Sequence, residues 1–258
     1  MPASDEKIRQ ILKISARLLN RSYVVSGNIT LPRGAKIIAM NHTDGCDPLY
    51  LPMLLDETPH FLLQDGLFQI PVVGRLLREA GQIPVYRESV RAREAMTQAC
   101  ELLRQGKTIV VFPEGRNVPA GQRIPAKTGT VRMALETGAP IIPLGLYTPP
   151  EDLTHLHFRW MGSERSGLWQ FSGKSYMRFG LPWRLGAVSE VNPPDLHALT
   201  EEMMNQIYRL VAEIQSVRSK SQPCLTHGNS GHPTRAQTFE RIFAGPAREP
   251  AAQMSRRE

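Results

Sequence analysis

Cysteine is scarce in this sequence, with three widely spaced residues in 258 and no Cys-x-x-Cys pair. Such a set favours neither a disulfide framework nor a cysteine zinc site, so we expect a reducing, cytoplasmic compartment. No apolar stretch approaches the roughly 18 to 20 residues that span a bilayer. The N-terminus carries Asp5 and Glu6 where a signal peptide would be basic. We therefore expect neither a signal peptide nor a transmembrane helix.

Two catalytic signatures are also missing. The sequence has no Gly-x-Ser-x-Gly elbow and no phosphate-binding Gly-x4-Gly-Lys-Ser/Thr loop, which disfavours a serine hydrolase and a nucleoside-triphosphatase. The net charge of +7 instead favours an anionic partner, such as nucleic acid, an anionic membrane, a phosphorylated substrate or an acidic carrier protein. Few aromatic residues are interleaved with the basic ones, so nucleic acid is disfavoured.

Residues 5–22 have the pattern of a basic amphipathic helix. Ile8 and Leu12 lie on its apolar face, and Arg9 and Lys13 lie on the opposite face. A helix of this kind lies in a membrane interface, or it packs its apolar face on the core of its own domain. The pattern leaves both interpretations open, and we treat 1–22 as a separate N-terminal segment.

The middle of the chain alternates apolar runs with helical patterns. The expected strands are Lys36–Met40, Phe61–Leu63, Gln82–Tyr86, Thr108–Phe112 and Pro140–Leu146, with weaker ones at His155–Trp160 and Ser175–Phe179. The expected helices are Pro48–Leu55, Pro71–Ala80, Val90–Gln105, Thr130–Glu136 and one within Pro194–Val217. This order predicts an α/β fold with a largely parallel central sheet flanked by helices.

The end of the chain changes composition. After about Ser219 the sequence is rich in Ser, Pro, Gly, Arg and Gln and has few aliphatic residues. Such a segment cannot bury enough apolar surface to offset the entropy of ordering, so we predict a disordered tail over 219–258. One folded domain over 23–218 remains.

The first group of reactive residues follows the strand at 36–40. His42 and Asp47 would lie about 140° apart on a continuous helix. The Thr-Asp-Gly turn between them and Pro48 break that geometry, and Pro48 makes Asp47 a candidate N-cap. A turn can then bring the carboxylate to the imidazole, fixing its tautomer and leaving Nε2 to take a proton from a hydroxyl. The alternative is that Asp47 only caps a helix and His42 is a loop residue.

Two other strand ends carry charged groups. Glu114, Gly115 and Arg116 follow the strand at 108–112, and Arg87 follows the strand at 82–86. A carboxylate and a guanidinium beside a glycine suit a hydroxylated, phosphorylated substrate, although a surface ion pair fits each group taken alone. The carboxyl ends of parallel strands meet at one edge of a sheet, so the three groups are expected to converge.

Four segments together resemble the glycerolipid acyltransferase family, which includes glycerol-3-phosphate and 1-acylglycerol-3-phosphate acyltransferases. They are His42-x4-Asp47, Ile83-Pro84-Val85-x-Arg87, Phe112-Pro113-Glu114-Gly115 and Ala139-Pro140-Ile141-Ile142-Pro143. The segments stand in the family's order, and the resemblance covers about residues 24–182. It implies a glycerol-phosphate acyltransferase-like fold that includes a site-shaping block at Pro143.

The resemblance also implies a mechanism. His42 would be the general base, oriented by Asp47, and the acceptor hydroxyl would attack the thioester of acyl-CoA or acyl-carrier protein directly. No acyl-enzyme, metal or cofactor is implied. The acceptor would be bound by Arg87, by Glu114, Gly115 and Arg116, and by Lys127, which with Gly129 resembles a Lys-x-Gly that follows the third block.

The resemblance favours transfer to 1-acylglycerol 3-phosphate, giving phosphatidic acid, at the cytoplasmic face of an anionic membrane. In the family the third block usually reads Glu-Gly-Thr/Ser-Arg, whereas Arg116 and Asn117 stand here in the last two places. The identity of the acceptor therefore stays open. The alternatives to 1-acylglycerol 3-phosphate are glycerol 3-phosphate, another lysophospholipid and a non-phosphorylated lipid.

Other interpretations of the chain are weaker. A non-enzymatic protein that binds anionic membranes would account only for the positive net charge. His155 and His157 share a face of an expected strand but have no third metal ligand nearby in the sequence, and Cys46 is expected to be a small buried residue rather than a nucleophile.

Overall fold

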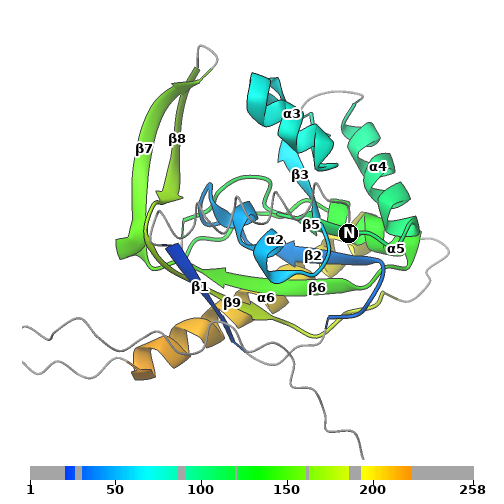
Figure 1. Ribbon diagram of the computed structural model, residues 1–258. Helices are drawn as coiled ribbons and strands as arrows, with labels where there is room; N and C mark the ends of the chain where they lie inside the picture. Colours follow the sequence, from blue (N-terminus) through cyan, green and yellow to red (C-terminus); the bar gives the residue numbers. More distant parts are fainter. Residues whose placement is uncertain are drawn as a thin grey trace, which may run out of the picture. The chain divides into compact units, whose positions relative to one another are not determined.

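The computed structural model describes residues 21–26, 31–86, 91–119, 121–160, 163–185 and 193–221. Its centre is a seven-stranded sheet in the order β1-β9-β6-β2-β5-β3-β4 (Figure 1). These strands are β1 (Arg21–Ser26), β2 (Lys36–Met40), β3 (His60–Gln64), β4 (Ile83–Val85), β5 (Thr108–Val111), β6 (Ile141–Tyr147) and β9 (Gly173–Phe179). Neighbours pair in parallel except β6 with β9, which confirms the predicted largely parallel sheet.

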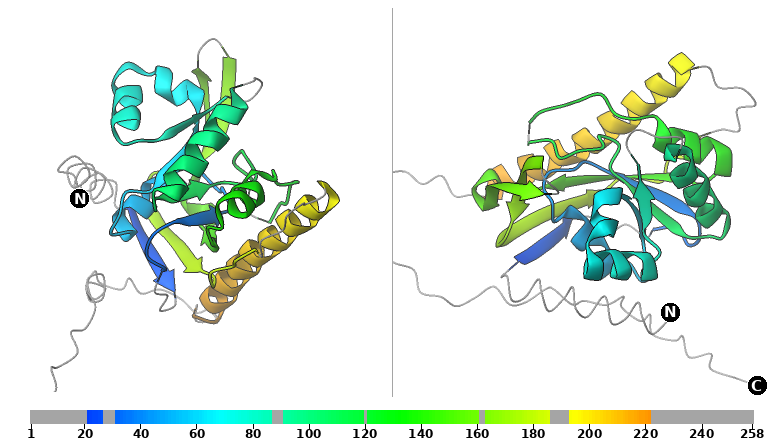
Figure 2. Two further views of the ribbon diagram at one scale, coloured as in Figure 1. Left: turned by 90° about the vertical axis from the view of Figure 1, so that its right-hand side faces the viewer. Right: turned by 90° about the horizontal axis from the view of Figure 1, so that it is seen from above.

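Helices connect the strands and cover the sheet (Figures 1 and 2). They are α2 (Leu51–Leu54), α3 (Pro71–Glu79), α4 (Ala92–Arg104), α5 (Gly129–Thr137) and α6 (Pro193–Ser221), with short 3-10 helices η1 (Asp47–Leu49), η2 (Asp65–Gln69) and η3 (Pro150–Asp152). Among the described helices, none combines the length and the apolar character needed to cross a bilayer.

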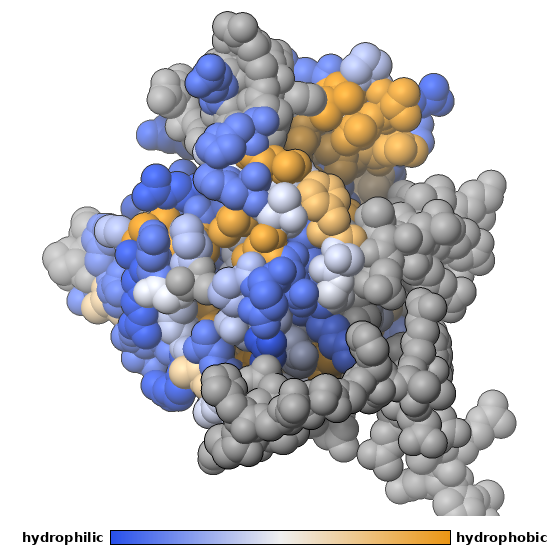
Figure 3. All heavy atoms as spheres, turned by 90° about the vertical axis from the view of Figure 1, so that its left-hand side faces the viewer, coloured by the Kyte–Doolittle hydropathy of each residue, from blue (hydrophilic) through white to orange (hydrophobic). Residues whose placement is uncertain are grey.

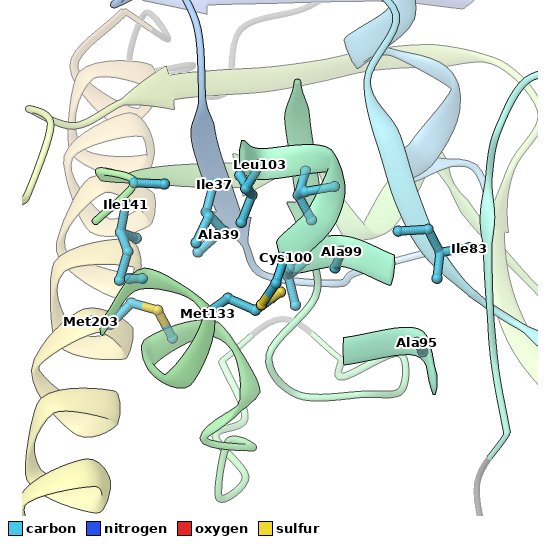
Figure 4. Close-up of a cluster of buried hydrophobic side chains, with 14 of the residues drawn as sticks. Ile37, Ala39, Ile83, Ala95, Ala99, Cys100, Leu103, Met133, Ile141 and Met203 are labelled. Atoms are coloured by element: carbon cyan, nitrogen blue, oxygen red, sulfur yellow. The ribbon is translucent and has the colours of Figure 1, made fainter. Parts of the chain in front are cut away.

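The central strands β2 and β5 are apolar after their first residue, as expected for strands whose two faces are both buried. Ile37 and Ala39 of β2 point into a cluster with α4, α5 and α6 (Figure 4). Ile38 and Met40 point the other way, into a second cluster that contains Tyr50. Two cores on opposite faces hold β2 and β5 rigidly, so the loops at their carboxyl ends leave from a fixed base.

A separate hairpin, β7 (Leu153–Trp160) and β8 (Ser163–Gln170), stands beside the sheet. Its base contacts the loop after β2, where the N–H of Gly45 donates to the carbonyl of Leu168 at 2.9 Å. The indole of Trp169 lies so close to Gly45 that a Cβ there would be 3.0 Å from the ring. The sequence indicated β7 but not β8, whose Ser-Glu-Arg-Ser-Gly segment has no apolar alternation.

Two predicted boundaries were wrong. The N-terminal helix was expected to reach residue 22, but Arg21 and Ser22 begin β1, which pairs in parallel with β9 from Arg21↔Gly173 onward. Pairing with a distant strand overrides local helical periodicity here. The tail was expected from 219, but α6 continues through Ser221. The rest of the predicted N-terminal helix, 5–20, and the tail beyond 221 lie outside the described residues.

Candidate active site

The loop that leaves β2 brings His42 and Asp47 together. His42 Nδ1 lies 2.9 Å from Asp47 Oδ2. The same oxygen accepts the backbone N–H of Thr43 at 2.7 Å and of Asp44 at 3.0 Å. The turn is closed by the Asp44 carboxylate, which accepts the N–H of Cys46 at 2.7 Å, an arrangement that favours Asp at this position. The predicted contact through a turn is therefore present.

The predicted helix cap is wrong. Asp47 is the first residue of η1, Cys46 occupies the N-cap position, and no side chain caps this helix. The Asp47 carboxylate turns back into the loop because it is fully buried, and a buried carboxylate requires hydrogen-bond donors. The N–H groups of Thr43 and Asp44 are the donors it finds there.

The charge state of Asp47 results from opposing effects. Burial raises the pKa of its carboxyl to about 7, and the hydrogen bonds from Asp44 and Thr43 oppose that rise. These donors favour the ionised form, in which the carboxylate accepts the Nδ1 proton of His42. Nε2 of His42 is then the nitrogen that can accept a proton.

His42 itself is held as a neutral imidazole. Its side chain is 16% exposed and stacks on Phe112, with ring centroids 4.1 Å apart. Burial lowers the pKa of His42 to about 4, while the negative charges of Glu114 and Asp44 raise it. At neutral pH the ring can therefore accept a proton, as a general base must.

Glu114 holds the backbone of this histidine. Its Oε2 accepts the backbone N–H of His42 at 2.7 Å, and its Oε1 accepts the hydroxyl of Tyr208 at 2.6 Å. Burial raises the pKa of Glu114, and the hydrogen bonds from Tyr208 and His42 oppose that rise. The sequence suggested that Glu114 binds substrate, but both of its oxygens are engaged by groups of the protein.

Three of the other predicted substrate-binding residues lie in the loop after β5 or against it. Gly115 is exposed and has φ +68°, which favours glycine, and a Cβ there would lie 3.1 Å from Cε of Lys127. Lys127 is exposed, and its N–H donates to the carbonyl of Pro113 at 2.8 Å. Arg116 is exposed next to Gly115. The loop thus brings Lys127 to Gly115, while Arg87 lies outside the described residues.

Tyr208 is the main residue of the candidate active site that the sequence did not reveal. It lies on α6, 94 residues after Glu114, and its ring also stacks under Arg123 at 4.4 Å. In the sequence it is one position of an ordinary apolar stripe, so no local signal marks it. A cavity of about 220 Å³ beside it is lined in part by Thr43, Glu114 and Arg123.

No metal centre is evident in the part of the chain that the structure describes. Within it, no group of three or more His, Cys, Asp or Glu side chains is arranged to hold an ion. The rings of His155 and His157 lie 4.4 Å apart on the hairpin. Cys46 is buried at the base of the hairpin, where its thiol donates to the carbonyl of Gln170 at 3.4 Å.

Comparison with known proteins identifies the segment that contains this site. The model of the acyltransferase family matches residues 22–147, which include His42, Asp47, Glu114 and Lys127. Residues 22–147 belong to the acyltransferase family. Tyr208 lies beyond the matched acyltransferase segment, so its contact with Glu114 links that segment to the C-terminal helix.

Curated relatives are similar to about half of the chain. The chain is 34% identical over 142 residues to the 1-acyl-sn-glycerol-3-phosphate acyltransferase of Borreliella burgdorferi, covering 54% of this chain and 57% of that protein. It is 31% identical over 111 residues to the chloroplastic 1-acyl-sn-glycerol-3-phosphate acyltransferase BAT2 of Brassica napus, covering 43% of this chain and 32% of that protein. The chain thus spans between about a third and somewhat over half the length of these relatives.

A solved structure shares the fold. The crystal structure of the 1-acyl-sn-glycerophosphate acyltransferase PlsC of Thermotoga maritima has a TM-score of 0.60 to this chain at 23% identity. The similarity covers 85% of this chain and 81% of that one. It therefore extends beyond the matched acyltransferase segment.

Proposed function

We propose that this protein is an O-acyltransferase that moves a fatty acyl group from a thioester to the free hydroxyl of 1-acylglycerol 3-phosphate, giving phosphatidic acid. The observation that carries the proposal is the 2.9 Å contact between His42 Nδ1 and the buried Asp47 carboxylate. Membership of residues 22–147 in the acyltransferase family supports the reaction, and the names of the relatives support the acceptor.

In the proposed reaction, Nε2 of His42 takes the proton of the acceptor hydroxyl. The oxygen attacks the thioester carbonyl carbon, the new C–O bond forms, and the C–S bond breaks. The departing thiolate then receives the proton from His42. Asp47 stabilises the imidazolium between these two transfers, and the nearby charge of Glu114 favours the same protonated form.

For the acceptor phosphate we propose Arg116 and Lys127 as the cationic partners. Both are exposed, and the left-handed turn at Gly115 brings the Lys127 chain across it. Arginine and lysine both bind phosphate through charge-assisted hydrogen bonds. Acyl-CoA and acyl-carrier protein are both proposed as donors. We further propose that the reaction takes place at the cytoplasmic surface of a membrane, since the acceptor is a lipid.

The test is release of the thiol from acyl-CoA and from acyl-carrier protein in the presence of 1-acylglycerol 3-phosphate. His42→Ala should lower kcat by about 10³-fold, since general-base catalysis is lost. His197→Ala removes an exposed histidine of α6 and should leave kcat unchanged. Unchanged turnover in His42→Ala would refute the proposed mechanism.

A panel of acceptors tests the substrate separately. Glycerol 3-phosphate and a 1-acylglycerol without phosphate should both be poorer acceptors than 1-acylglycerol 3-phosphate. Equal turnover of the acceptor that lacks phosphate would remove Arg116 and Lys127 from the proposed site. Faster turnover of glycerol 3-phosphate would change the assigned acceptor and leave the role of His42 intact.

A further inference from the structure

Helix α3 turns its apolar residues toward solvent. Val72 is 71% exposed, Leu76 49% and Val73 39%, and Leu67 of the adjoining η2 is 39% exposed. We call these four residues the α3 apolar face. Figure 3 shows a broad hydrophobic patch in its upper right part. Contiguous exposed apolar surface of this kind marks an interaction site rather than ordinary scatter.

The opposite side of α3 shows why the helix has this orientation. Gly74 is the buried residue of α3, and a Cβ there would collide with the backbone of Phe68. The Arg78 guanidinium donates to the carbonyl of Phe68 at 3.0 Å. A surface helix normally packs its apolar stripe on the core. Here a backbone approach and a hydrogen bond orient the helix, and the apolar stripe stays outside.

Basic groups flank the α3 apolar face. The Arg75 side chain is 80% exposed, and its Nε donates to Glu79 at 2.8 Å. Arg78 adds a second guanidinium, so α3 carries two arginines against one glutamate. Exposed apolar residues with arginines at their border are the pattern of a helix that lies in the interface of an anionic bilayer. The net charge of +7 of the whole chain complements the same surface.

The position of α3 relates this face to the candidate active site. The helix follows β3, which pairs with β5, the strand that leads to Phe112. Phe61 of β3 stacks near Phe112 at 6.4 Å, and Phe112 stacks on His42. Helix α3 and the β7–β8 hairpin rise on the same side of the sheet (Figures 1 and 2). Aromatic contacts therefore join β3, the strand that precedes η2 and α3, to the imidazole.

We propose that the α3 apolar face docks the protein on an anionic lipid bilayer, with Val72 and Leu76 inserted among the acyl chains and Arg75 at the headgroups. This docking deepens the proposed function, since its acceptor and product are lipids of that surface. A bilayer fits better than a protein partner because the apolar residues are flanked by basic ones on a single convex helix.

The first experiment measures binding of the full chain to vesicles of equimolar phosphatidylcholine and phosphatidylglycerol by sedimentation. Val72→Asp/Leu76→Asp should lower binding at least about tenfold, because two charges enter the apolar interface. The matched control is Leu181→Asp/Phe171→Asp, which alters residues that are 80% and 43% exposed elsewhere. It should bind like the parent protein. Arg75→Gln should lose about fivefold on these vesicles and nothing on pure phosphatidylcholine.

The second experiment compares two forms of the acceptor. The Asp variant should lose turnover of 1-acylglycerol 3-phosphate embedded in vesicles but keep turnover of a short-chain, monomeric form in solution. Such a split supports docking by α3. If the parent turns over neither form, the proposed function is refuted. If the parent nevertheless binds vesicles and the Asp variant does not, the docking proposal is still supported.

Other outcomes would overturn the docking proposal. One is a parent protein that does not bind the vesicles, and another is an Asp variant that binds them as well as the parent does. A large drop in thermal stability in both Val72→Asp and the milder Val72→Ser would show that part of the chain covers this face. A parent dimer that becomes monomeric in the variant, with vesicle binding unchanged, would show that the face joins two copies of the chain.

Discussion

The loops that leave β2 and β5 start from neighbouring parallel strands, yet they are held in different ways. In the β2 loop the carboxylate of Asp47 is held by local groups, the side chain of His42 and the N–H groups of Thr43 and Asp44, all within five residues. The β5 loop is ordered from a distance. Glu114 receives the hydroxyl of Tyr208, 94 residues away, and accepts the N–H of His42, 72 residues away.

The difference separates two requirements of the candidate active site. The contact that fixes the imidazole tautomer is local, so a short motif is enough to encode it. The electrostatic setting of the imidazole depends on Glu114, and the charge of Glu114 depends in turn on a helix at the other end of the domain. Changes in the first loop should therefore abolish activity, and changes in the second should tune it.

The largest effect is expected from Asp47→Asn. An asparagine amide can donate to Nδ1, which favours the tautomer with hydrogen on Nε2, and that tautomer cannot accept the hydroxyl proton. We expect kcat to fall by about 10²- to 10⁴-fold. Steady-state thioester release measures it, with Asp195→Asn of the exposed α6 surface as the control. A loss below tenfold would mean that the local contact does not set the reactivity of His42.

A pH profile gives the next effect. Because burial lowers the pKa of His42 to about 4, the imidazole itself stays neutral from pH 7 down to 5.5. With Asp47 kept ionised by its hydrogen bonds with Thr43 and Asp44 against the burial that raises its pKa to about 7, kcat/KM should change less than about twofold in that range. An imidazole with the ordinary pKa near 6.5 would lose about tenfold at pH 5.5 because it would be mostly protonated. The measurement is kcat/KM against pH with a short-chain acceptor. A tenfold fall by pH 5.5 would contradict the buried, neutral histidine.

The smallest effect is expected from Tyr208→Phe, which removes the hydroxyl and keeps the ring under Arg123. The hydrogen bond from Tyr208 lowers the pKa of Glu114, so its loss should raise that pKa and weaken the negative charge behind His42. We expect kcat to fall about three- to tenfold with KM unchanged, and the part of the acid-side loss of activity that follows protonation of Glu114 to begin at higher pH.

Tyr176→Phe, at a partly buried position of β9, is the control for this variant. A purely structural role of Tyr208 would change the melting temperature without moving the pH profile. That result would show that the β5 loop positions the backbone only and does not tune the base.

Much of the architecture follows from the sequence because apolar runs and turn residues are local signals. The central strands at 36–40 and 108–112 and the helices after them were predicted, and so was the meeting of His42 with Asp47. The hairpin strand β8 was not, since its residues carry no alternation and are ordered by pairing with β7 and by contact with the loop at Gly45. Strand β1 (Arg21–Ser26) was missed for a similar reason, because its partner is β9, which begins at Gly173.

The sequence by itself determined the order of the central strands and helices, the turn between His42 and Asp47, and the family-like spacing of the charged blocks. Only the tertiary structure decided what Glu114 does. Gly145 of β6 lets α6 approach so closely that a Cβ there would lie 2.7 Å from Cβ of Leu210, and the same helix delivers Tyr208 to the carboxylate. The physical reason is that hydrogen bonds within a loop follow from local chain geometry. The pairing of a buried carboxylate with a distant hydroxyl depends on how a helix packs across the whole sheet.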